Sequence, residues 1–141
     1  DSRMKFKETE ASYYAGLFDG EGCVGIYLDR SKIYKALPRH YLQVIITNTN
    51  VTVLMDLKNQ FNGCLTTHKQ HPTSWGKKRI YWWRLSGKGA KEFLETIYPY
   101  SRIKRQEIEI AIRFQSIAER GARVEHYDEM DTIRKELMGM R

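Results

Sequence analysis

The stretch that most constrains the fold is YYAGLFDGEGCVGI, residues 13–26, where a helical sequence becomes a strand within a few positions. The segment from Glu8 to Phe18 is predicted to be a helix, and Gly20 is expected to end it. From Cys23 onward the apolar residues recur at every second position, which predicts a strand with Val24, Ile26 and Leu28 on one face. An acidic residue, Glu21, lies between two glycines where the two patterns meet.

The rest of the chain predicts two strand pairs, each followed by a helix, and a helical end. A basic connection that contains proline is expected to continue through Arg39, and a helix capped by Asn50 is expected to stop at Asn62–Gly63. The strands are predicted over 41–47, 64–71 and 79–85, and the later helices over 88–98, 103–118 and 127–138. This order indicates an α+β fold, with one antiparallel sheet and helices on one of its faces. We expect one domain, 1–141, with a core over 8–118 and a helical extension over 119–141.

Charge and cysteine content narrow the classes of function. Lysine and arginine number 24 against 17 acidic residues, so the formal net charge is +7, which favours a polyanionic partner such as nucleic acid. The two cysteines, Cys23 and Cys64, have no metal-ligand spacing, which argues against a zinc site and a disulfide-rich secreted scaffold, and we expect both as buried thiols. With neither a membrane span nor a signal sequence evident, we expect no membrane partner and an intracellular protein, in a prokaryotic or phage-infected cytoplasm or an organelle matrix.

The sheet face turned away from the helices is predicted to carry groups that hydrogen-bond or stack. A ribbon with such side chains can enter the major groove of DNA and contact base edges. A solvated face with no ligand is the alternative. By alternation, the face comprises Tyr27, Asp29, Tyr41, Gln43, Thr66, His68, Gln70, Trp82 and Arg84. The connection and the loop before the last strand add basic groups for phosphate contacts: Arg30, Lys32, Lys35, Arg39 and Lys78.

Residues 14–22, YAGLFDGEG, resemble the nine-residue signature of the LAGLIDADG homing endonucleases. Tyr14 replaces leucine at its first position and Phe18 replaces isoleucine at its fifth, but the acid at its eighth position is kept as Glu21. Two further stretches are similar to that family. IITNTN places Asn48 where a polar residue faces the cleavage centre, and PYSRIKRQE places Lys104 where a basic residue lies near the scissile phosphate.

The resemblance implies a homing-endonuclease fold with a saddle-shaped sheet, and a site built by two motif helices packed together. In that arrangement Ala11, Ala15 and Gly16 would let the two helices approach. Glu21 and the carbonyl of Gly20 would hold Mg²⁺, with Mn²⁺ able to substitute and Ca²⁺ binding without cleavage. One motif gives half a site, so the resemblance implies a homodimer on a near-palindromic site in double-stranded DNA.

The implied activity is metal-dependent hydrolysis of both DNA strands, leaving short 3′ overhangs, with Glu21, Asn48 and Lys104 as catalytic residues. Two alternatives use the same fold. One is a maturase that binds intron RNA, and the other is a regulator that binds DNA without cutting it. For Asp19, a role in capping or bracing the paired helices is favoured over metal binding.

Overall fold

The computed structural model describes residues 8–34, 37–68, 79–121 and 124–140. Within these ranges the chain forms the mixed α and β order that the sequence predicts. The first half holds α1 (Glu8–Glu21), β1 (Gly22–Tyr34), β2 (Leu37–Asn48) and α2 (Val51–Phe61). The second half holds β3 (Cys64–His68), β4 (Ile80–Ser86), α3 (Gly87–Ile97), the 3₁₀-helix η2 (Tyr98–Tyr100), α4 (Arg105–Ala118) and α5 (Tyr127–Met138).

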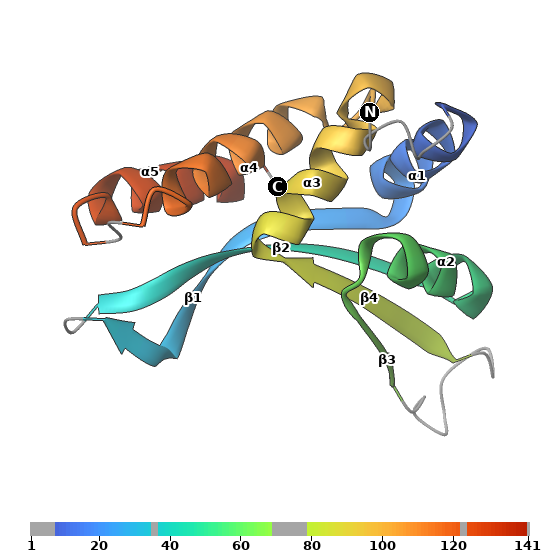
Figure 1. Ribbon diagram of the computed structural model, residues 1–141, viewed down its shortest axis with the longest axis horizontal. Helices are drawn as coiled ribbons and strands as arrows, with labels where there is room; N and C mark the ends of the chain where they lie inside the picture. Colours follow the sequence, from blue (N-terminus) through green and yellow to red (C-terminus); the bar gives the residue numbers. More distant parts are fainter. Residues whose placement is uncertain (1–7, 35–36, 69–78, 122–123, 141) are drawn as a thin grey trace.

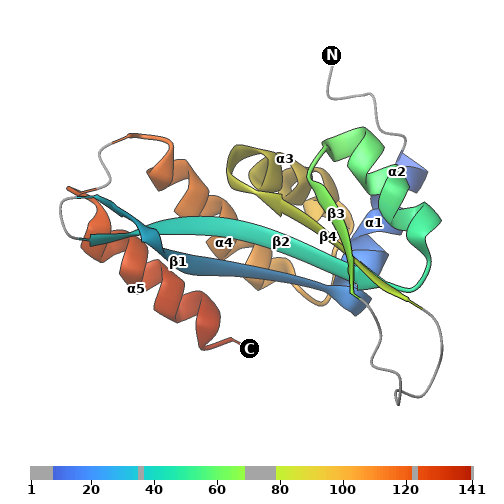
Figure 2. The same cartoon turned by 90° about the horizontal axis from the view of Figure 1, so that it is seen from below.

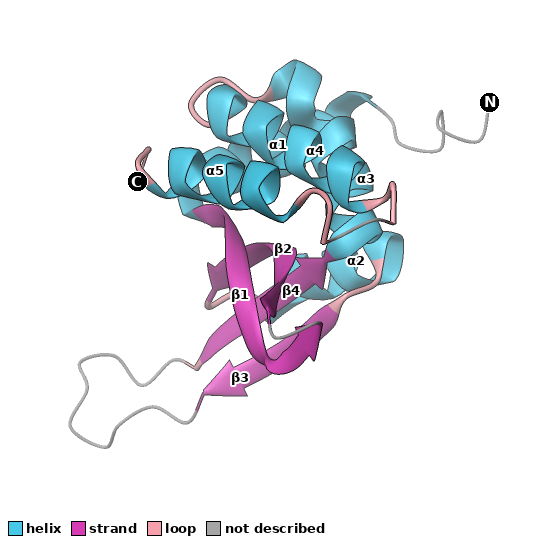
Figure 3. Cartoon of the chain, turned by 90° about the vertical axis from the view of Figure 1, so that its left-hand side faces the viewer, coloured by secondary structure: helices cyan, strands magenta, loops and turns pink. Residues whose placement is uncertain are grey.

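The four strands form one antiparallel sheet in the order β1-β2-β4-β3. Figure 1 shows the sheet arched, with α1, α3, α4 and α5 above its convex side. Figure 2, from below, shows β1 and β2 crossing in front of α4 and α5, and Figure 3 shows the helices gathered on one side of the sheet. The predicted α+β class, with helices on one face, is therefore confirmed.

The core lies between this sheet and the helices. Trp83 and Phe93 are fully buried, and their ring centroids are 5.2 Å apart in an edge-to-face arrangement. Phe93 also meets Phe18 of α1 at 6.1 Å and Phe61 of α2 at 5.0 Å. Such aromatic contacts add to the free energy gained by burying apolar area. Because they join α1, α2, α3 and β4, the end of α1 is attached to a rigid body.

The boundaries of α2 follow from local chemistry that the sequence shows. Asn50 is its N-cap, and its side chain accepts a hydrogen bond from the Val53 N–H. At the other end, Asn62 and Gly63 have φ values of 69° and 96°. A Cβ at Gly63 would lie 2.5 Å from the Arg84 carbonyl oxygen. Glycine is therefore needed at Gly63, both for the left-handed backbone and for the close approach to β4.

Several boundaries differ from the predictions. Residues 30–34 and 37–39, predicted as a connection, belong to β1 and β2, because strand pairing continues through Asp29↔Arg39 and Ile33↔Pro38 with a register shift between the two pairs. Helix α1 continues to Glu21 instead of ending at Gly20, and α4 begins at Arg105. Every helix in the described ranges is too short or too polar to cross a membrane.

Helix α5 covers the β1–β2 hairpin, as its apolar side predicts. Met130, Ile133 and Leu137 are buried. His40 of β2 is also buried, and its Nε2 lies 3.0 Å from Oδ1 of Asp131 on α5. Arg134 also donates to this carboxylate, at 2.8 Å, and holds the pKa of Asp131 well below its ordinary value, with His40 adding to the effect. The far end of the hairpin is thus fixed to the helical layer.

Candidate functional site

Glu21 is the last residue of α1, and its side chain is exposed. The next residue, Gly22, is buried against the helix that has just ended. A Cβ at Gly22 would lie 2.3 Å from Cδ1 of Phe18 and 2.8 Å from the Phe18 carbonyl oxygen, which is closer than any side chain permits. Glycine therefore lets the chain turn directly from α1 into β1, and this turn leaves the Glu21 carboxylate at the surface.

Asn48 ends β2 beside this carboxylate. Its Nδ2 donates to Oε2 of Glu21 at 2.6 Å, and its Oδ1 accepts from the Asn50 N–H at 2.8 Å. Because the backbone N–H can only donate, the second contact sets the orientation of the amide group and directs its N–H toward Glu21. The structure thus brings two of the three predicted catalytic residues into direct contact.

Lys104 is the N-cap residue of α4, and its ammonium reaches the other side of the α1–β1 junction. Its Nζ donates to the Phe18 carbonyl at 3.2 Å and also to the Gly22 carbonyl. It lies 5.4 Å from the Phe18 ring centroid. A cation is favoured at the C-terminus of a helix, where unpaired carbonyls concentrate negative charge. Lys104 therefore binds the two residues on either side of the segment 19–21.

The segment before α4 binds the Asp19 carboxylate. The carboxylate accepts from the Ser101 hydroxyl and from three consecutive backbone N–H groups, at Arg102, Ile103 and Lys104. Partial burial alone would raise the pKa of Asp19, but these donors together lower it below its ordinary value. The role of Ser101, which is buried, was missed in the sequence, where nothing pairs it with an acid 82 positions away.

The donors at this junction suit a hard cation but do not complete a site. The Glu21 carboxylate and the Gly20 carbonyl offer oxygen ligands of the kind Mg²⁺ prefers. Within the described ranges, however, no group of three or more His, Cys, Asp or Glu residues could hold a metal ion. The described residues therefore supply some oxygen ligands of the kind a magnesium site uses, but not a complete set.

The three small residues predicted at a helix–helix interface separate into two sets. Ala11 and Ala15 are 4% and 0% exposed, because they pack into the core of their own chain. They therefore have no surface for a partner. Gly16 is exposed, and a Cβ built there or at Gly20 would meet nothing within 4 Å. The open side of α1 is formed by Thr9, Ser12, Tyr13, Gly16 and Gly20.

Strand register places most of the predicted nucleic-acid contacts on the open sheet face, opposite the helices. In β2, His40, Leu42, Val44 and Ile46 are buried, so the residues between them point away from the core. Paired residues of an antiparallel sheet share a face, which carries the assignment to the other strands. The rows are Tyr27–Tyr41, Asp29–Arg39, Gly25–Gln43–Ser86, Cys23–Ile45–Arg84–Cys64 and Thr47–Trp82–Thr66.

Several side chains on this face are held by neighbours. The rings of Tyr27 and Tyr41 lie 5.6 Å apart, and the Arg84 guanidinium lies 4.6 Å from the Trp82 ring. Asp29 accepts hydrogen bonds from the N–H and hydroxyl of the neighbouring Ser31. Cys64 is exposed here, so its prediction as a buried thiol is wrong, while Cys23 is only partly exposed. Cys64 pairs with Arg84 on the open sheet face, which explains why its thiol is exposed and not buried.

The remaining predicted contacts are described only in part. Arg30 is exposed in the irregular part of β1. Lys32 lies in β1 and His68 ends β3, but their side chains lie outside what the structure describes. Lys35, Gln70 and Lys78 fall outside the described residues altogether.

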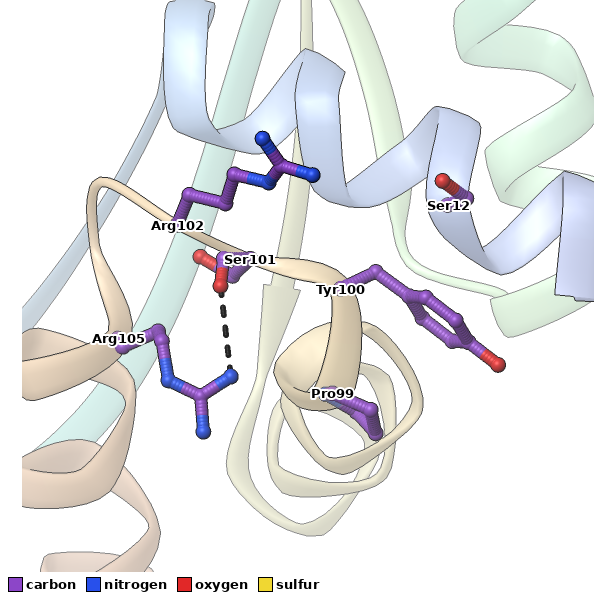
Figure 4. A pocket seen from close by; sticks show the side chains of 6 residues that line it. All are labelled: Ser12, Pro99, Tyr100, Ser101, Arg102 and Arg105. Carbon is purple, nitrogen blue, oxygen red and sulfur yellow. Dashed lines mark hydrogen bonds between the residues drawn. The ribbon is translucent and has the colours of Figure 1, made fainter.

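A hollow of about 470 Å³ lies beside the junction, between α1 and the start of α4. Figure 4 shows its lining, in which Arg105 reaches back toward Ser101. The Arg105 guanidinium donates to the Ser101 and Tyr98 carbonyls and lies 4.2 Å from the Tyr98 ring centroid. None of the three predicted catalytic residues lines this hollow. The exposed Glu21 side chain therefore lies outside this hollow.

Comparisons with known proteins agree with this architecture. A family model described as LAGLIDADG endonuclease matches residues 14–108. A search of curated proteins finds no match. Among solved structures, the homing endonuclease I-CvuI bound to the I-CreI target superposes with a TM-score of 0.78 at 14% identity, over 95% of this chain and 83% of that one. The archaeal intron-encoded homing endonuclease I-Vdi141I, complexed with DNA, gives 0.76 at 14% identity, over 95% and 85%. The homing endonuclease I-TnaI gives 0.71 at 22% identity, over 94% and 88%.

Proposed function

The chain belongs to the LAGLIDADG endonuclease family, and from this premise we propose that it is a site-specific DNA homing endonuclease acting as a homodimer. The observation that carries the proposal is the surroundings of Glu21. The one carboxylate of the motif that is left at the surface receives the Asn48 amide, while Lys104 binds the same helix end. An acid and an amide at one exposed point, with a cation bound to the same helix end, are groups of the kind needed beside a phosphodiester.

The open side of α1 supports a dimer. Thr9, Tyr13, Gly16 and Gly20 follow one another at helical spacing, and Tyr13 is 56% exposed. The two glycines leave space that their own chain does not use. A second copy packed here about a two-fold axis brings the ends of two α1 helices, and two Glu21 carboxylates, to the same place. The missing half of the metal site is then the partner's.

In this arrangement each residue has a separate task. Glu21 and the Gly20 carbonyl would hold Mg²⁺, which when bound supplies positive charge for the transferring phosphate and its leaving oxygen. Lys104 offsets negative charge that develops on the phosphate. Asn48 holds the Glu21 carboxylate and offers an amide for a water molecule. Cleavage of both strands, with short 3′ overhangs, is part of the proposal.

The open sheet face is proposed to read the DNA. Its arch, visible in Figure 1, turns a concave surface outward, and two similar solved structures are complexes with DNA. Arg84, Gln43 and Tyr41 present hydrogen-bonding groups in adjacent rows. The basic residues of the β1–β2 hairpin are suited to phosphates on either side of the groove.

The test is cleavage of a plasmid that carries the uninterrupted sequence around the insertion point of the gene. The wild-type protein should cut it in Mg²⁺ and bind it without cutting in Ca²⁺. E21Q keeps the shape of the side chain and removes its charge, so cleavage should fall by at least about 100-fold while binding in Ca²⁺ is kept. E125Q, at an exposed glutamate between α4 and α5, is the control and should cut like the wild type.

Two results would count against the proposal. An uncut plasmid with firm binding to it, or to the intron RNA, would favour a regulator or a maturase. Cleavage by E21Q at the wild-type rate would mean that Glu21 does not serve the reaction.

A further inference from the structure

The Asp19 carboxylate is fully occupied by one short segment of the chain. Its Oδ1 accepts from the Ser101 hydroxyl at 2.5 Å and from the Lys104 N–H at 3.2 Å. Its Oδ2 accepts from the N–H groups of Arg102 at 2.8 Å and Ile103 at 3.2 Å. A carboxylate has about four lone-pair sites in total, so these donors use its capacity. A metal ion could bind Asp19 only by displacing one of them.

These backbone donors need such an acceptor. They immediately precede α4, and the N-cap residue Lys104 makes no side-chain capping bond to that helix. The N–H of an N-cap residue and those of the residues before it have no partner within the helix, so they are satisfied from elsewhere. Asp19, more than 80 residues away in the chain, accepts from the N-cap N–H of Lys104 and from the N–H groups of the two residues before it, and so fixes the segment that leads into α4.

The contact is reciprocal. Asp19 places a negative charge at the N-terminal end of α4, and Lys104 places a positive charge on the carbonyls at the C-terminal end of α1. Both charges suit the helix dipole that they face. The carbonyls that Lys104 binds belong to Phe18 and Gly22, and these residues flank the segment that carries Asp19 and Glu21. The two helix ends therefore hold each other through two ionised side chains.

We propose that Asp19 is a positioning residue, which fixes the backbone of residues 102–104 so that Lys104 is held at the α1–β1 junction next to Glu21. The inference rests on the proposed nuclease function. It assigns the first acid of the motif to the placement of Lys104 instead of to the metal ion. In the nuclease, loss of Asp19 should slow the cleavage step without weakening divalent-ion binding or DNA binding.

The decisive variant is D19N. Asparagine keeps one acceptor oxygen but turns an N–H donor toward the backbone N–H groups of residues 102 and 103, which removes about half of the contacts. A displacement of about 1 Å at a catalytic group can cost roughly 100-fold in rate. We expect a loss of that order in single-turnover cleavage, with the DNA dissociation constant in Ca²⁺ and the Ca²⁺ concentration needed for binding both unchanged. D56N, at an exposed aspartate on α2, is the control and should cut like the wild type.

A double-mutant cycle separates positioning from general destabilisation. If Asp19 acts through Lys104, D19N should cost little further rate in the K104M background. Three results would overturn the proposal. They are rate losses of D19N and K104M that multiply in the double variant, a higher Ca²⁺ concentration needed for DNA binding by D19N, and a D19N cleavage rate equal to that of the wild type. If D19N does not fold, S101A removes a single donor and should give a smaller loss in the same direction.

Amide hydrogen exchange tests the brace without any cleavage. The N–H groups of Arg102, Ile103 and Lys104 should exchange faster in D19N than in the wild type, while those of α2 stay unchanged. This measurement decides the inference where K104M leaves no measurable rate, and unchanged exchange at all three positions would overturn it. If the wild-type protein does not cut DNA but these N–H groups exchange faster in D19N, the proposed function is rejected. The contact between Asp19 and residues 102–104 is then still supported.

Discussion

The two glycines beside Glu21 should respond to alanine with opposite signs. At Gly22, the new Cβ would lie 2.3 Å from a ring carbon of the fully buried Phe18 and 2.8 Å from its carbonyl oxygen. The ring is enclosed by Phe93 and cannot move freely, and the carbonyl belongs to the last turn of α1. At Gly20, the same Cβ would meet nothing within 4 Å, on a helical backbone.

The magnitudes follow from these contacts. Overfilling a packed site costs about 1–3 kcal/mol, and we expect G22A at the upper end because one of its clashes is with backbone. For a chain of this size that corresponds to a fall in melting temperature of roughly 6–12 °C. G20A should gain about 0.5–1 kcal/mol, the usual advantage of alanine over glycine inside a helix. The two variants should therefore differ by about 3.5–4 kcal/mol in their free energy of unfolding.

The assay is urea unfolding followed by tryptophan fluorescence, since Trp83 lies in the core. Protein concentration has to be equal and low, because dimerisation adds a concentration-dependent contribution to stability. A G22A free energy within about 0.5 kcal/mol of the wild type, which is the usual range for neutral surface changes, would refute the reasoning. So would a G20A variant as unstable as G22A at concentrations where the chain is monomeric. A loss by G20A only at high concentration would instead show that a second copy covers the end of α1.

Two further predictions concern the open sheet face and α5. R84A should relax preference at one base position at a cost of about 1–3 kcal/mol, measured by competition binding to single-base variants of the target. A uniform loss over all variants would place Arg84 on phosphate, and R84K should keep part of a phosphate contact but lose a bidentate one. Asp131 has a folded pKa below its unfolded value, so the stability it adds is present above about pH 4 and is lost as the pH falls further. D131N should therefore be less stable than the wild type at pH 6, and the difference should shrink toward pH 2 in acid unfolding curves; a constant difference would contradict the assignment.

The sequence predicts the parts of this fold that depend on neighbouring residues. The cap of α2, its stop at Asn62–Gly63 and the faces of the strand positions whose side chains are described all follow from local pattern, and the structure confirms them. The extended β1–β2 hairpin could not be predicted from local pattern, because Pro38 and the charged residues around it favour a loop. Only pairing with the opposite strand makes them strand residues.

In the candidate site, too, the residues can be predicted from the sequence but their long-range contacts cannot. Glu21, Asn48 and Lys104 are recognisable from motif and position, but their contacts are not. That Lys104 binds carbonyls of α1, and that Asp19 binds the segment leading into α4, depends on two helix ends meeting across more than 80 residues. The contact of His40 with Asp131 is not predicted either, because the acid lies 91 positions away and gives no signal in the sequence.

Along β2, side chains buried in the core alternate with side chains on the open face of the sheet. Tyr41 and Gln43 can therefore be exchanged for almost any residue that tolerates an extended backbone, while Leu42 and Val44 continue to hold the fold. What the outer surface recognises is free to drift without a matching loss of stability. A chain built in this way can acquire a new target through a handful of substitutions, none of which has to be compensated in the interior.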